Sequence, residues 1–295
     1  MVELDNARYT KRTMVGGLEA LEIRHPLLDA CVLLQGAQLI HFAPAGDDNW
    51  LWMSPQARFQ KGKPVRGGIP VCWPWFGDPP RNPDPVRSLV QSDSAHGFAR
   101  TALWRPVYLE ELEEAVCLTL ELDTTGVAYP WSGLAHAEIT FRFSPEQVTL
   151  ALTTGNTGTD LLAFTQALHT YLPVPSITET RIMGLDGARY IDTLDDWAAA
   201  EQAGDITFHG ETDRIYQAAP AIRVQTPGKQ YRLTSTGSGT TVVWNPGPEK
   251  SRRLSDFPDD GWTGMVCVET ANAALDFRTL TPGERHTLTM TLAES

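Results

Sequence analysis

The stretch HAEITFRFSPEQVTLALTTG, residues 136–155, indicates the fold class of this chain. Residues 136–144 and 147–155 are short segments rich in the aliphatic, aromatic and β-branched residues that are typical of strands. The turn at SPE between them is tight, so we expect the two segments to pair as an antiparallel hairpin. Such a hairpin predicts that the structure around it is also built from antiparallel strands.

Similar strand signals recur along the chain, separated by Gly, Pro, Asn and Asp. The further segments of this kind are residues 20–25, 30–35, 37–44, 102–112, 115–123, 161–172, 231–237, 240–246, 264–270 and 285–293. Helical signal is scarce, and the best candidate is residues 195–202, which Asp195 or Asp196 can cap. Because strands and helices do not alternate, we predict an all-β fold: one large antiparallel β-sandwich domain over residues 1–295, with few short helices.

The composition is that of a globular protein with an acidic bias. The 295 residues are 42% hydrophobic and 20% charged, which is enough to bury a sizeable core. The formal net charge of -12 disfavours partners such as nucleic acid or an anionic membrane surface, because both need positive fields. An anionic substrate would need a local cluster of arginines.

Targeting signals and cysteine usage predict where the protein works. The first seventeen residues, MVELDNARYTKRTMVGG, lack the apolar segment of a signal peptide. No apolar run approaches the ~20 residues of a membrane span. The four cysteines are scattered without a CxxC pair, so we interpret them as reduced thiols. We therefore expect a cytoplasmic protein with no membrane partner.

The segment LLAFTQALHTYL, residues 161–172, carries a candidate catalytic histidine. If the segment is one strand, alternation places Thr165, Ala167, His169 and Tyr171 on one face. An imidazole and a phenol then lie near the end of the strand. From this strand alone, His169 is either a functional group or a hydrogen-bonded histidine at a sheet edge.

The segment GMVCVET, residues 264–270, carries a candidate catalytic carboxylate. Alternation places Met265, Cys267 and Glu269 on one face of this apolar strand. A carboxylate there is costly unless it is paired, and desolvation raises its pKa toward the range of a general base. The alternative is that Glu269 lies past the end of the strand and is solvated.

A long loop is predicted at residues 77–97, and loops of this length often bind ligands. The segment SDSAHGFAR, residues 92–100, places His96 and Arg100 around Gly97. The glycine permits a turn or a close approach of the backbone to a ligand. The simpler interpretation is a solvated loop.

Two later segments carry further charged candidates. ETDRIYQ, residues 211–217, contains Asp213, and its simpler interpretation is a surface ion-pair segment. WNPGPEKSRRLSDFPDDGW, residues 244–262, contains a basic cluster of Lys250, Arg252 and Arg253. That cluster is either a solvated helical turn or a phosphate site.

The segment RGGIPVCWPWFG, residues 66–77, combines Arg66 with paired glycines, two prolines and three aromatic residues. The glycines allow close backbone bends and the prolines stiffen them. We expect Arg66 to supply positive charge beside an aromatic wall made by Trp73, Trp75 and Phe76. At least one of these three rings is expected to belong to the core.

Several enzyme signatures are absent from the sequence. It contains no GxGxxG, GxxxxGK[ST], GxSxG or HExxH motif. None of its seven histidines pairs with another at i, i+4 spacing, so the sequence predicts no metal site.

The order of these segments resembles one known family. RGGIPVCWPWFG, SAHGFAR, ALHTY, ETDRIY, VWNP with a following lysine, and DDGWTGMVCVE occur in the order seen in the aldose 1-epimerase superfamily. The greatest resemblance is to its glucose-6-phosphate 1-epimerase branch, the D-hexose-6-phosphate mutarotases, and it spans most of the chain. RGGIPVCWPWFG together with HGFAR is specific to this branch, whereas HTY or CVE alone is not.

The resemblance implies a large antiparallel β-sandwich that interconverts the α and β anomers of a sugar. Opening a cyclic hemiacetal requires a base at the anomeric hydroxyl and an acid at the ring oxygen. The resemblance implies that Glu269 is the general base and His169 the general acid. It implies no cofactor and no metal, since the reaction has no redox change and no poor leaving group.

The resemblance also implies substrate-binding residues. His96 and Asp213 match positions that hold the hydroxyls or the ring oxygen of the sugar. Arg66 and Arg100 match the arginines that bind the phosphate, and guanidinium groups suit phosphate because they bind it bidentately. The expected partner is a small-molecule sugar phosphate, and we expect a monomer or weak dimer.

The sequence departs from the branch at two places. Ala95 stands where glutamine often precedes the histidine, so a side-chain contact there is lost or replaced. Gly247 and Pro248 stand between VWNP and Lys250, where the family often has tryptophan and then lysine, so Lys250 has no assigned role.

Three alternatives to a sugar-phosphate epimerase stay open. One is mutarotation of free aldoses, although Arg66 and Arg100 would then have no partner. Another is a non-catalytic sugar-binding module, which would not need a matched acid and base. The third is a glycoside hydrolase or lyase that uses Asp213 and Glu269 as its two carboxylates, which would leave His169 without a task.

Overall fold

The hairpin predicted for residues 136–155 lies in the middle part of one of the two eight-stranded sheets. A computed structural model describes residues 7–294. Strand β8 (Ala135–Ser144) pairs with β9 (Gln147–Asn156), and the partners Ser144 and Gln147 leave a two-residue turn between them. Alternate residues of β8, among them Ile139 and Phe141, are fully buried. The predicted hairpin and the all-β class are confirmed.

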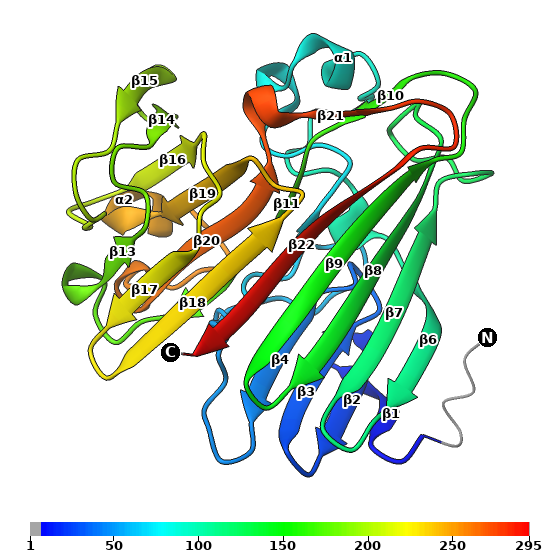
Figure 1. Cartoon of the computed structure of the whole chain (residues 1–295), viewed down its shortest axis with the longest axis horizontal. Helices are drawn as coiled ribbons and strands as arrows, with labels where there is room; N and C mark the ends of the chain where they lie inside the picture. Colours follow the sequence, from blue (N-terminus) through cyan, green and yellow to red (C-terminus); the bar gives the residue numbers. More distant parts are fainter. Residues whose placement is uncertain (1–6, 295) are drawn as a thin grey trace.

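This β8–β9 sheet has eight antiparallel strands (Figure 1). In spatial order they are β13 (Arg181–Met183), β17 (Ile222–Thr226), β18 (Lys229–Thr236), β22 (Arg285–Glu294), β9, β8, β7 (Val116–Asp123) and β6 (Arg105–Glu111).

A second eight-stranded sheet, the β19–β20 sheet, lies beside β17 and β18 in Figure 1. Its strands in order are β15 (Ala198–Glu201), β14 (Arg189–Asp192), β16 (Thr212–Tyr216), β19 (Thr240–Asn245), β20 (Met265–Asn272), β11 (Gln166–Leu168) and β5 (Val71–Cys72), and β12 (Tyr171–Pro173) also pairs with β20.

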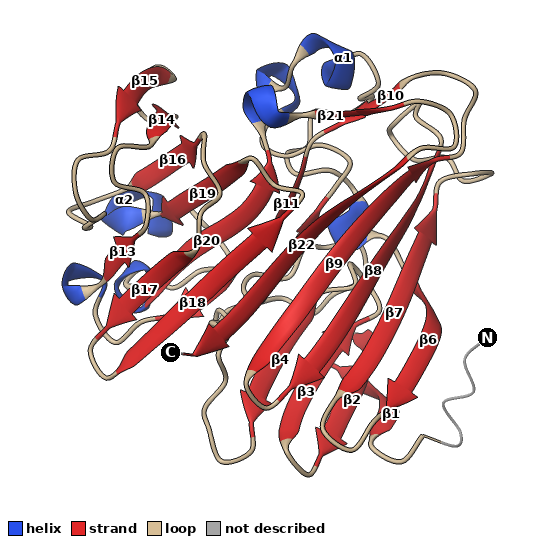
Figure 2. Cartoon of the chain, in the orientation of Figure 1, coloured by secondary structure: helices blue, strands red, loops and turns tan. Residues whose placement is uncertain are grey.

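Smaller elements complete the fold (Figure 2). The N-terminal sheet has four strands: β1 (Thr10–Val15), β2 (Leu18–His25), β3 (Leu28–Leu33) and β4 (Leu39–Pro44). A two-stranded sheet joins β10 (Leu162–Phe164) to β21 (Arg278–Leu280). The helices are single turns: α1 (Asp84–Arg87), α2 (Gly247–Ser251), and the 3-10 turns η2 (Pro79–Arg81), η3 (Ala99–Thr101), η4 (Ile177–Glu179), η5 (Gly261–Gly264) and η6 (Ala274–Asp276).

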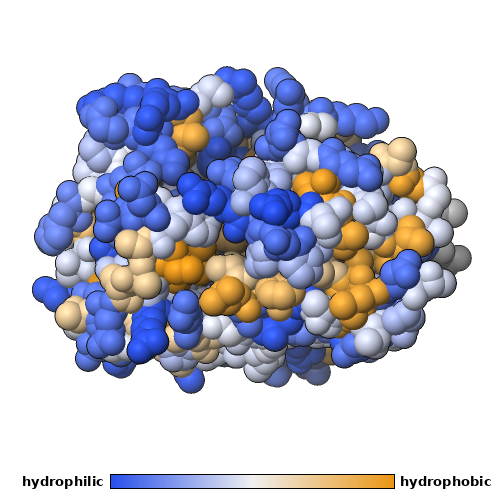
Figure 3. Space-filling view, turned by 90° about the horizontal axis from the view of Figure 1, so that it is seen from above, coloured by the Kyte–Doolittle hydropathy of each residue, from blue (hydrophilic) through white to orange (hydrophobic). Residues whose placement is uncertain are grey.

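The sheets share one hydrophobic core. Its buried residues come from the N-terminal sheet and from both eight-stranded sheets. Phe42 of β4 stacks on Phe143 of β8, with 6.0 Å between ring centroids, where the N-terminal sheet covers the β8–β9 sheet. On the face seen in Figure 3, apolar residues form only small patches among hydrophilic ones. Burial of the alternate strand faces therefore holds the sandwich together.

Two sequence predictions about individual elements are wrong. Residues 195–202 do not form a helix, because Asp196 and Trp197 adopt left-handed backbone angles (φ 47° and 62°) and Ala198–Glu201 instead pairs with β14. Residues 161–172 are not one continuous strand. They divide into β10, β11 and β12, because β10 pairs with β21 while β11 and β12 pair with β20.

The sequence analysis also missed several short strands, among them β1, β14, β16 and β17. The four cysteines are free thiols, as predicted. None of the helices formed by residues 7–294 is long and apolar enough to cross a membrane. Residues 1–6 of the segment expected to lack a signal peptide lie outside the described residues.

Candidate active site

One face of the β19–β20 sheet forms the floor of a cavity of about 320 Å³. The register of β11 against β20 pairs Leu168 with Thr270, and β12 continues the same register. The residue after Leu168 is His169, which therefore lies opposite Glu269 on the neighbouring strand. Two segments that are far apart in sequence thus deliver an imidazole and a carboxylate to one point.

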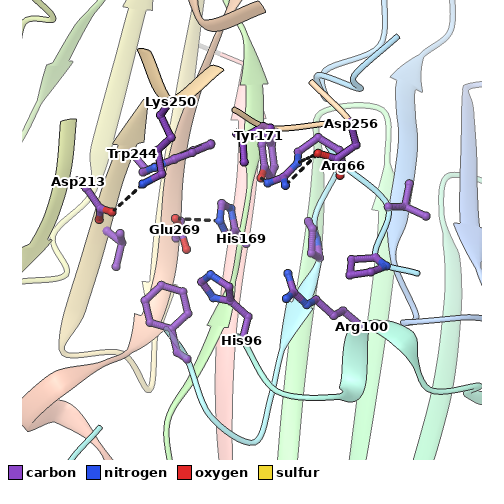
Figure 4. A pocket seen from close by; sticks show the side chains of 16 residues that line it. Arg66, His96, Arg100, His169, Tyr171, Asp213, Trp244, Lys250, Asp256 and Glu269 are labelled. Carbon is purple, nitrogen blue, oxygen red and sulfur yellow. Dashed lines mark hydrogen bonds and ion pairs between the residues drawn. The ribbon is translucent and has the colours of Figure 1, made fainter. Parts of the chain in front are cut away.

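Neighbouring strands extend this floor. Val242 of β19 pairs with Glu269, and Trp244, two residues further along β19, pairs with Asp213 of β16. Because alternate residues share a face, all of these side chains point to the same side of the sheet. Figure 4 shows Asp213, Trp244, Glu269 and His169 facing the cavity from adjacent strands.

All six residues proposed from the sequence line this cavity: His169, Glu269, Arg66, His96, Arg100 and Asp213. Glu269 is 1% exposed and lies within β20, so the alternative of a solvated carboxylate past the strand end is excluded. His169 is 12% exposed, and its Nε2 lies 3.4 Å from Glu269 Oε1. The pair is therefore largely shielded from solvent, but His169 can still be reached by a ligand in the cavity.

Burial shifts the pKa values of this pair in opposite directions. It raises the pKa of Glu269 well above its usual value, and the charge of Asp213 adds to the shift. It lowers the pKa of His169 to about 3, and the positive charges of Arg66 and Arg100 contribute to that fall. Both shifts favour the uncharged forms, a protonated carboxyl group and a neutral imidazole.

Arg66 enters the cavity from the RGG segment and is held by two partners (Figure 4). Its Nε and Nη2 donate to Asp256 Oδ1 at 3.3 and 3.2 Å, and its Nη1 donates to Tyr171 Oη at 3.2 Å. A guanidinium has five N–H groups, so these three bonds leave one N–H on each terminal nitrogen. Arg66 is thus oriented but retains two donors for an anion.

Arg100 lines the same cavity and has a different environment. Its Nη2 donates to the carbonyl oxygen of Ala95 at 2.7 Å. Within residues 7–294, no carboxylate lies within ion-pair distance of Arg100. Burial and the nearby charge of Arg66 lower its pKa. Position 95, which is alanine in this chain, therefore contributes its backbone carbonyl to the site.

His96 is fixed in one tautomer by the backbone of the same loop. The N–H of Gly77 donates to His96 Nδ1 at 3.3 Å, so the proton of the neutral ring lies on Nε2 and can be donated to a ligand. Burial and the charge of Arg100 hold the pKa of His96 well below its usual value.

Gly97 does approach a backbone closely, but that backbone is the protein's own. A Cβ at Gly97 would collide with the carbonyl of Trp73, and the residue has a φ of 66°. The loop that carries His96 and Arg100 therefore packs directly against the RGGIPVCWPWFG segment.

The rings of that segment divide between core and cavity. Trp73 and Trp75 are fully buried, and their indole N–H groups donate to Thr154 Oγ1 and to the carbonyl of Ser94. Phe76 lines the cavity and packs against His96, with 5.1 Å between ring centroids. The expectation that at least one ring belongs to the core is confirmed, and only Phe76 faces the cavity.

Asp213 and Lys250 lie on the opposite side of the cavity from Arg66 (Figure 4). Lys250 Nζ lies 3.0 Å from Glu211 Oε1 and 3.9 Å from Asp213 Oδ2. Burial raises the pKa of Asp213, and the charge of Lys250 opposes the shift. Asp213 therefore lines the cavity within ion-pair distance of Lys250. The segment also makes the ion pairs Glu211–Lys250 and Arg214–Asp192.

The three basic residues in the segment 250–253 do not share one site. Lys250 reaches the cavity, whereas Arg252 and Arg253 are exposed, and Arg252 pairs with Glu249. The sequence analysis gave no role to Tyr171, Trp244 or Asp256, which also line the cavity. Alternation on residues 161–172 was a usable signal for Tyr171, because it placed this residue on the face of His169.

Comparison with known proteins agrees with the architecture. The family model described as aldose 1-epimerase matches residues 19–293. This chain belongs to the aldose 1-epimerase family. Its reaction class is therefore the epimerisation of sugars.

Members of the family with sequences and folds similar to this chain include three useful examples. A protein of Escherichia coli K12 named "Putative glucose-6-phosphate 1-epimerase" is 36% identical over 277 residues, which are 89% of this chain and 86% of that protein. A protein of Cenchrus ciliaris with the same name is 31% identical over 86% of this chain and 77% of its own length. The crystal structure of a protein from Salmonella typhimurium, named "putative mutarotase (YeaD)", superposes with a TM-score of 0.86 at 30% identity, over 97% of this chain and 94% of that chain.

The donor set of this family member does not resemble a metal centre. Within residues 7–294, no group of three His, Cys, Asp or Glu side chains is arranged to hold a metal ion.

Proposed function

We propose that this epimerase interconverts the α and β anomers of a hexose 6-phosphate, with glucose 6-phosphate as the expected substrate. The observation that carries the proposal is that Arg66 and Arg100 line the same cavity as the His169–Glu269 pair. The names of the relatives that are 36% and 31% identical support the same substrate.

In the proposed reaction, Glu269 and His169 open and close the sugar ring. Glu269 removes the proton of the anomeric hydroxyl while His169 donates a proton to the ring oxygen, so the bond between C1 and the ring oxygen breaks and an aldehyde forms. Rotation about C1–C2 presents the other face of the aldehyde, and the reverse proton transfers close the ring. Each group is expected to contribute about 10²- to 10⁴-fold to the rate.

The resting protonation state can supply the reactive one. The reactive pair needs a carboxylate and an imidazolium, which together hold one titratable proton. A protonated carboxyl group beside a neutral imidazole, the state that both pKa shifts favour, holds the same number. Only a transfer from Oε1 to Nε2, across 3.4 Å, separates the two states. A phosphate dianion beside Arg66 and Arg100 would offset the positive charge that lowers the pKa of His169, and so favour the imidazolium.

The arginines are well suited to a phosphate and poorly suited to a neutral sugar. Arg66 retains two N–H donors on its terminal nitrogens, and Arg100 has no carboxylate partner within residues 7–294. Leaving a partly buried guanidinium without a counter-charge is costly. A dianionic ligand would supply the missing counter-charge and remove that cost. Because the net charge of the protein is -12, such a ligand would be attracted by these arginines locally and not by the protein as a whole.

The remaining two of the six proposed site residues, His96 and Asp213, can bind the sugar itself. His96 offers its Nε2–H as a donor, and Asp213 offers carboxylate oxygens as acceptors for hydroxyl groups. We assign them to hydroxyl and ring-oxygen recognition.

Exchange NMR tests the proposal. Magnetisation exchange between the two anomeric protons should be accelerated for glucose 6-phosphate far more than for glucose at equal protein concentration. Acceleration of glucose alone would overturn the phosphate assignment. Binding without acceleration of either sugar would indicate a binding module, and release of an alcohol from a glycoside would indicate a hydrolase.

A further inference from the structure

Tyr171 connects the two halves of the cavity. Its hydroxyl oxygen accepts a hydrogen bond from Arg66 Nη1 at 3.2 Å. Its ring lies against the imidazole of His169, with 4.8 Å between centroids and 10° between planes. One side chain therefore contacts both the proposed phosphate-binding arginine and the proposed general acid (Figure 4).

The position of this ring is fixed from several sides. The ring of Tyr171 also stacks on Trp52, with 5.9 Å between centroids and 17° between planes, so it packs against two rings. The backbone of Tyr171 is also bonded on both sides, since its N–H donates to Gly68 and its carbonyl accepts from Trp52. With 2% exposure, Tyr171 has little freedom to move, and it limits the motion of the imidazole in turn.

The O–H group of Tyr171 can still donate a hydrogen bond. It accepts from Arg66, and within residues 7–294 no acceptor for its own proton is present. A phosphate that takes the two remaining N–H groups of Arg66 would meet this O–H at the same place. A charge-assisted bond from the hydroxyl would then add to binding of the anion.

We propose that Tyr171 has two separable tasks in this site: its hydroxyl orients Arg66 and binds the substrate's phosphate, and its ring positions His169 for proton transfer. The inference rests on the proposed function, because it assigns a phosphate to Arg66. It adds a residue to which the resemblance gives no role.

Two substitutions separate the tasks. Tyr171→Phe removes only the hydroxyl and keeps the stack, whereas Tyr171→Leu removes both the hydroxyl and the flat ring. Calorimetry with inorganic phosphate measures the affinity for phosphate and so tests the first task. Exchange NMR with glucose 6-phosphate measures kcat and KM. Tyr231→Phe, on β18 outside the cavity, is the matched control for loss of a buried tyrosine hydroxyl.

For Tyr171→Phe we expect phosphate binding to weaken about 10-fold and KM to rise by a similar factor, with a smaller change in kcat. For Tyr171→Leu we expect the same weakening and, in addition, a fall in kcat of about 10-fold or more. Tyr231→Phe should change neither.

Phosphate binding within two-fold of wild type in Tyr171→Phe would overturn the first task. Equal kcat values for Tyr171→Phe and Tyr171→Leu, in two folded variants with matching circular dichroism, would overturn the second. If the wild-type protein does not accelerate anomer exchange of glucose 6-phosphate, the proposed function fails, whereas the calorimetric comparison still tests the hydroxyl.

Discussion

His169 and Glu269 face each other across two antiparallel strands, with 3.4 Å between Nε2 and Oε1. The contact is set by strand register and not by a flexible loop. It places two titratable groups with oppositely shifted pKa values at the centre of one cavity. This arrangement is the basis of the first two predictions.

Glu269→Gln should lower the rate of anomer exchange by about 10²- to 10⁴-fold while ligand binding is largely kept, because the amide preserves shape but cannot accept the proton. Exchange NMR and calorimetry measure the two quantities. Glu138→Gln, on β8 and outside the cavity, is the control and should be fully active. Full activity of Glu269→Gln would exclude Glu269 as the general base.

The same substitution should stabilise the fold at pH 8. The pKa of Glu269 is raised in the folded state, so the folded protein binds a proton more tightly than the unfolded chain, and stability is lost as pH rises above the unfolded value near 4.5. Glutamine removes this loss, and Tm should rise by about 2 °C per kcal/mol gained. A lower Tm at pH 8 than in wild type would contradict the assigned direction.

Arg100→Ala should raise KM for glucose 6-phosphate by about 10- to 100-fold, because a charge-assisted bond to phosphate is lost. The effect on glucose should be much smaller, since glucose carries no phosphate. Arg142→Ala, at an exposed position of β8, is the control. Equal losses for the two sugars would show that Arg100 acts on the cavity as a whole and not on phosphate.

The pH profile should depend on the substrate. A phosphate monoester loses its second proton near pH 6, so kcat/KM for glucose 6-phosphate should fall as pH drops below ~6. His169 does not explain such a limb, because its pKa of about 3 leaves it neutral there in the free protein. The profile for glucose should lack the limb at pH 6, and a shared limb would assign it to the protein.

Gly97→Ala should unfold more readily than Gly126→Ala. Both glycines have a left-handed backbone, with φ of 66° and 76°, but only at Gly97 would a Cβ collide with another backbone, that of Trp73. Gly126→Ala measures the strain alone, expected to be about 1–2 kcal/mol. Denaturant unfolding should show a clearly larger loss for Gly97→Ala, and equal losses would mean that the loop adjusts freely.

Much of the fold could be predicted from sequence, and so could the candidacy of six residues that the structure brings to one cavity. Alternation in residues 136–155 gives the hairpin, because strand faces have a period of two. The motif order pointed to six of the sixteen residues that line the cavity. The helix expected at residues 195–202 fails because local propensity does not register the left-handed backbone at Asp196 and Trp197.

What the sequence could not provide is register and distant pairing. That His169 lies opposite Glu269 depends on which residues of β11 and β20 pair, and their alternation is equally compatible with other registers. Arg66 and Asp256 are 190 positions apart, so their contact exists only in the folded chain. The contact of Tyr171 with Arg66, 105 positions away, could not be predicted for the same reason.

The floor of the cavity is made of hydrogen-bonded strands, which limits the motion of the side chains that it carries. Strands β16, β19 and β20 hold Asp213, Trp244 and Glu269 at spacings set by the backbone. In the proposed reaction the protein can therefore stay still, and the open-chain aldehyde makes the half-turn about C1–C2. The enzyme would then act as a rigid framework around a cavity of about 320 Å³, in which the substrate rotates.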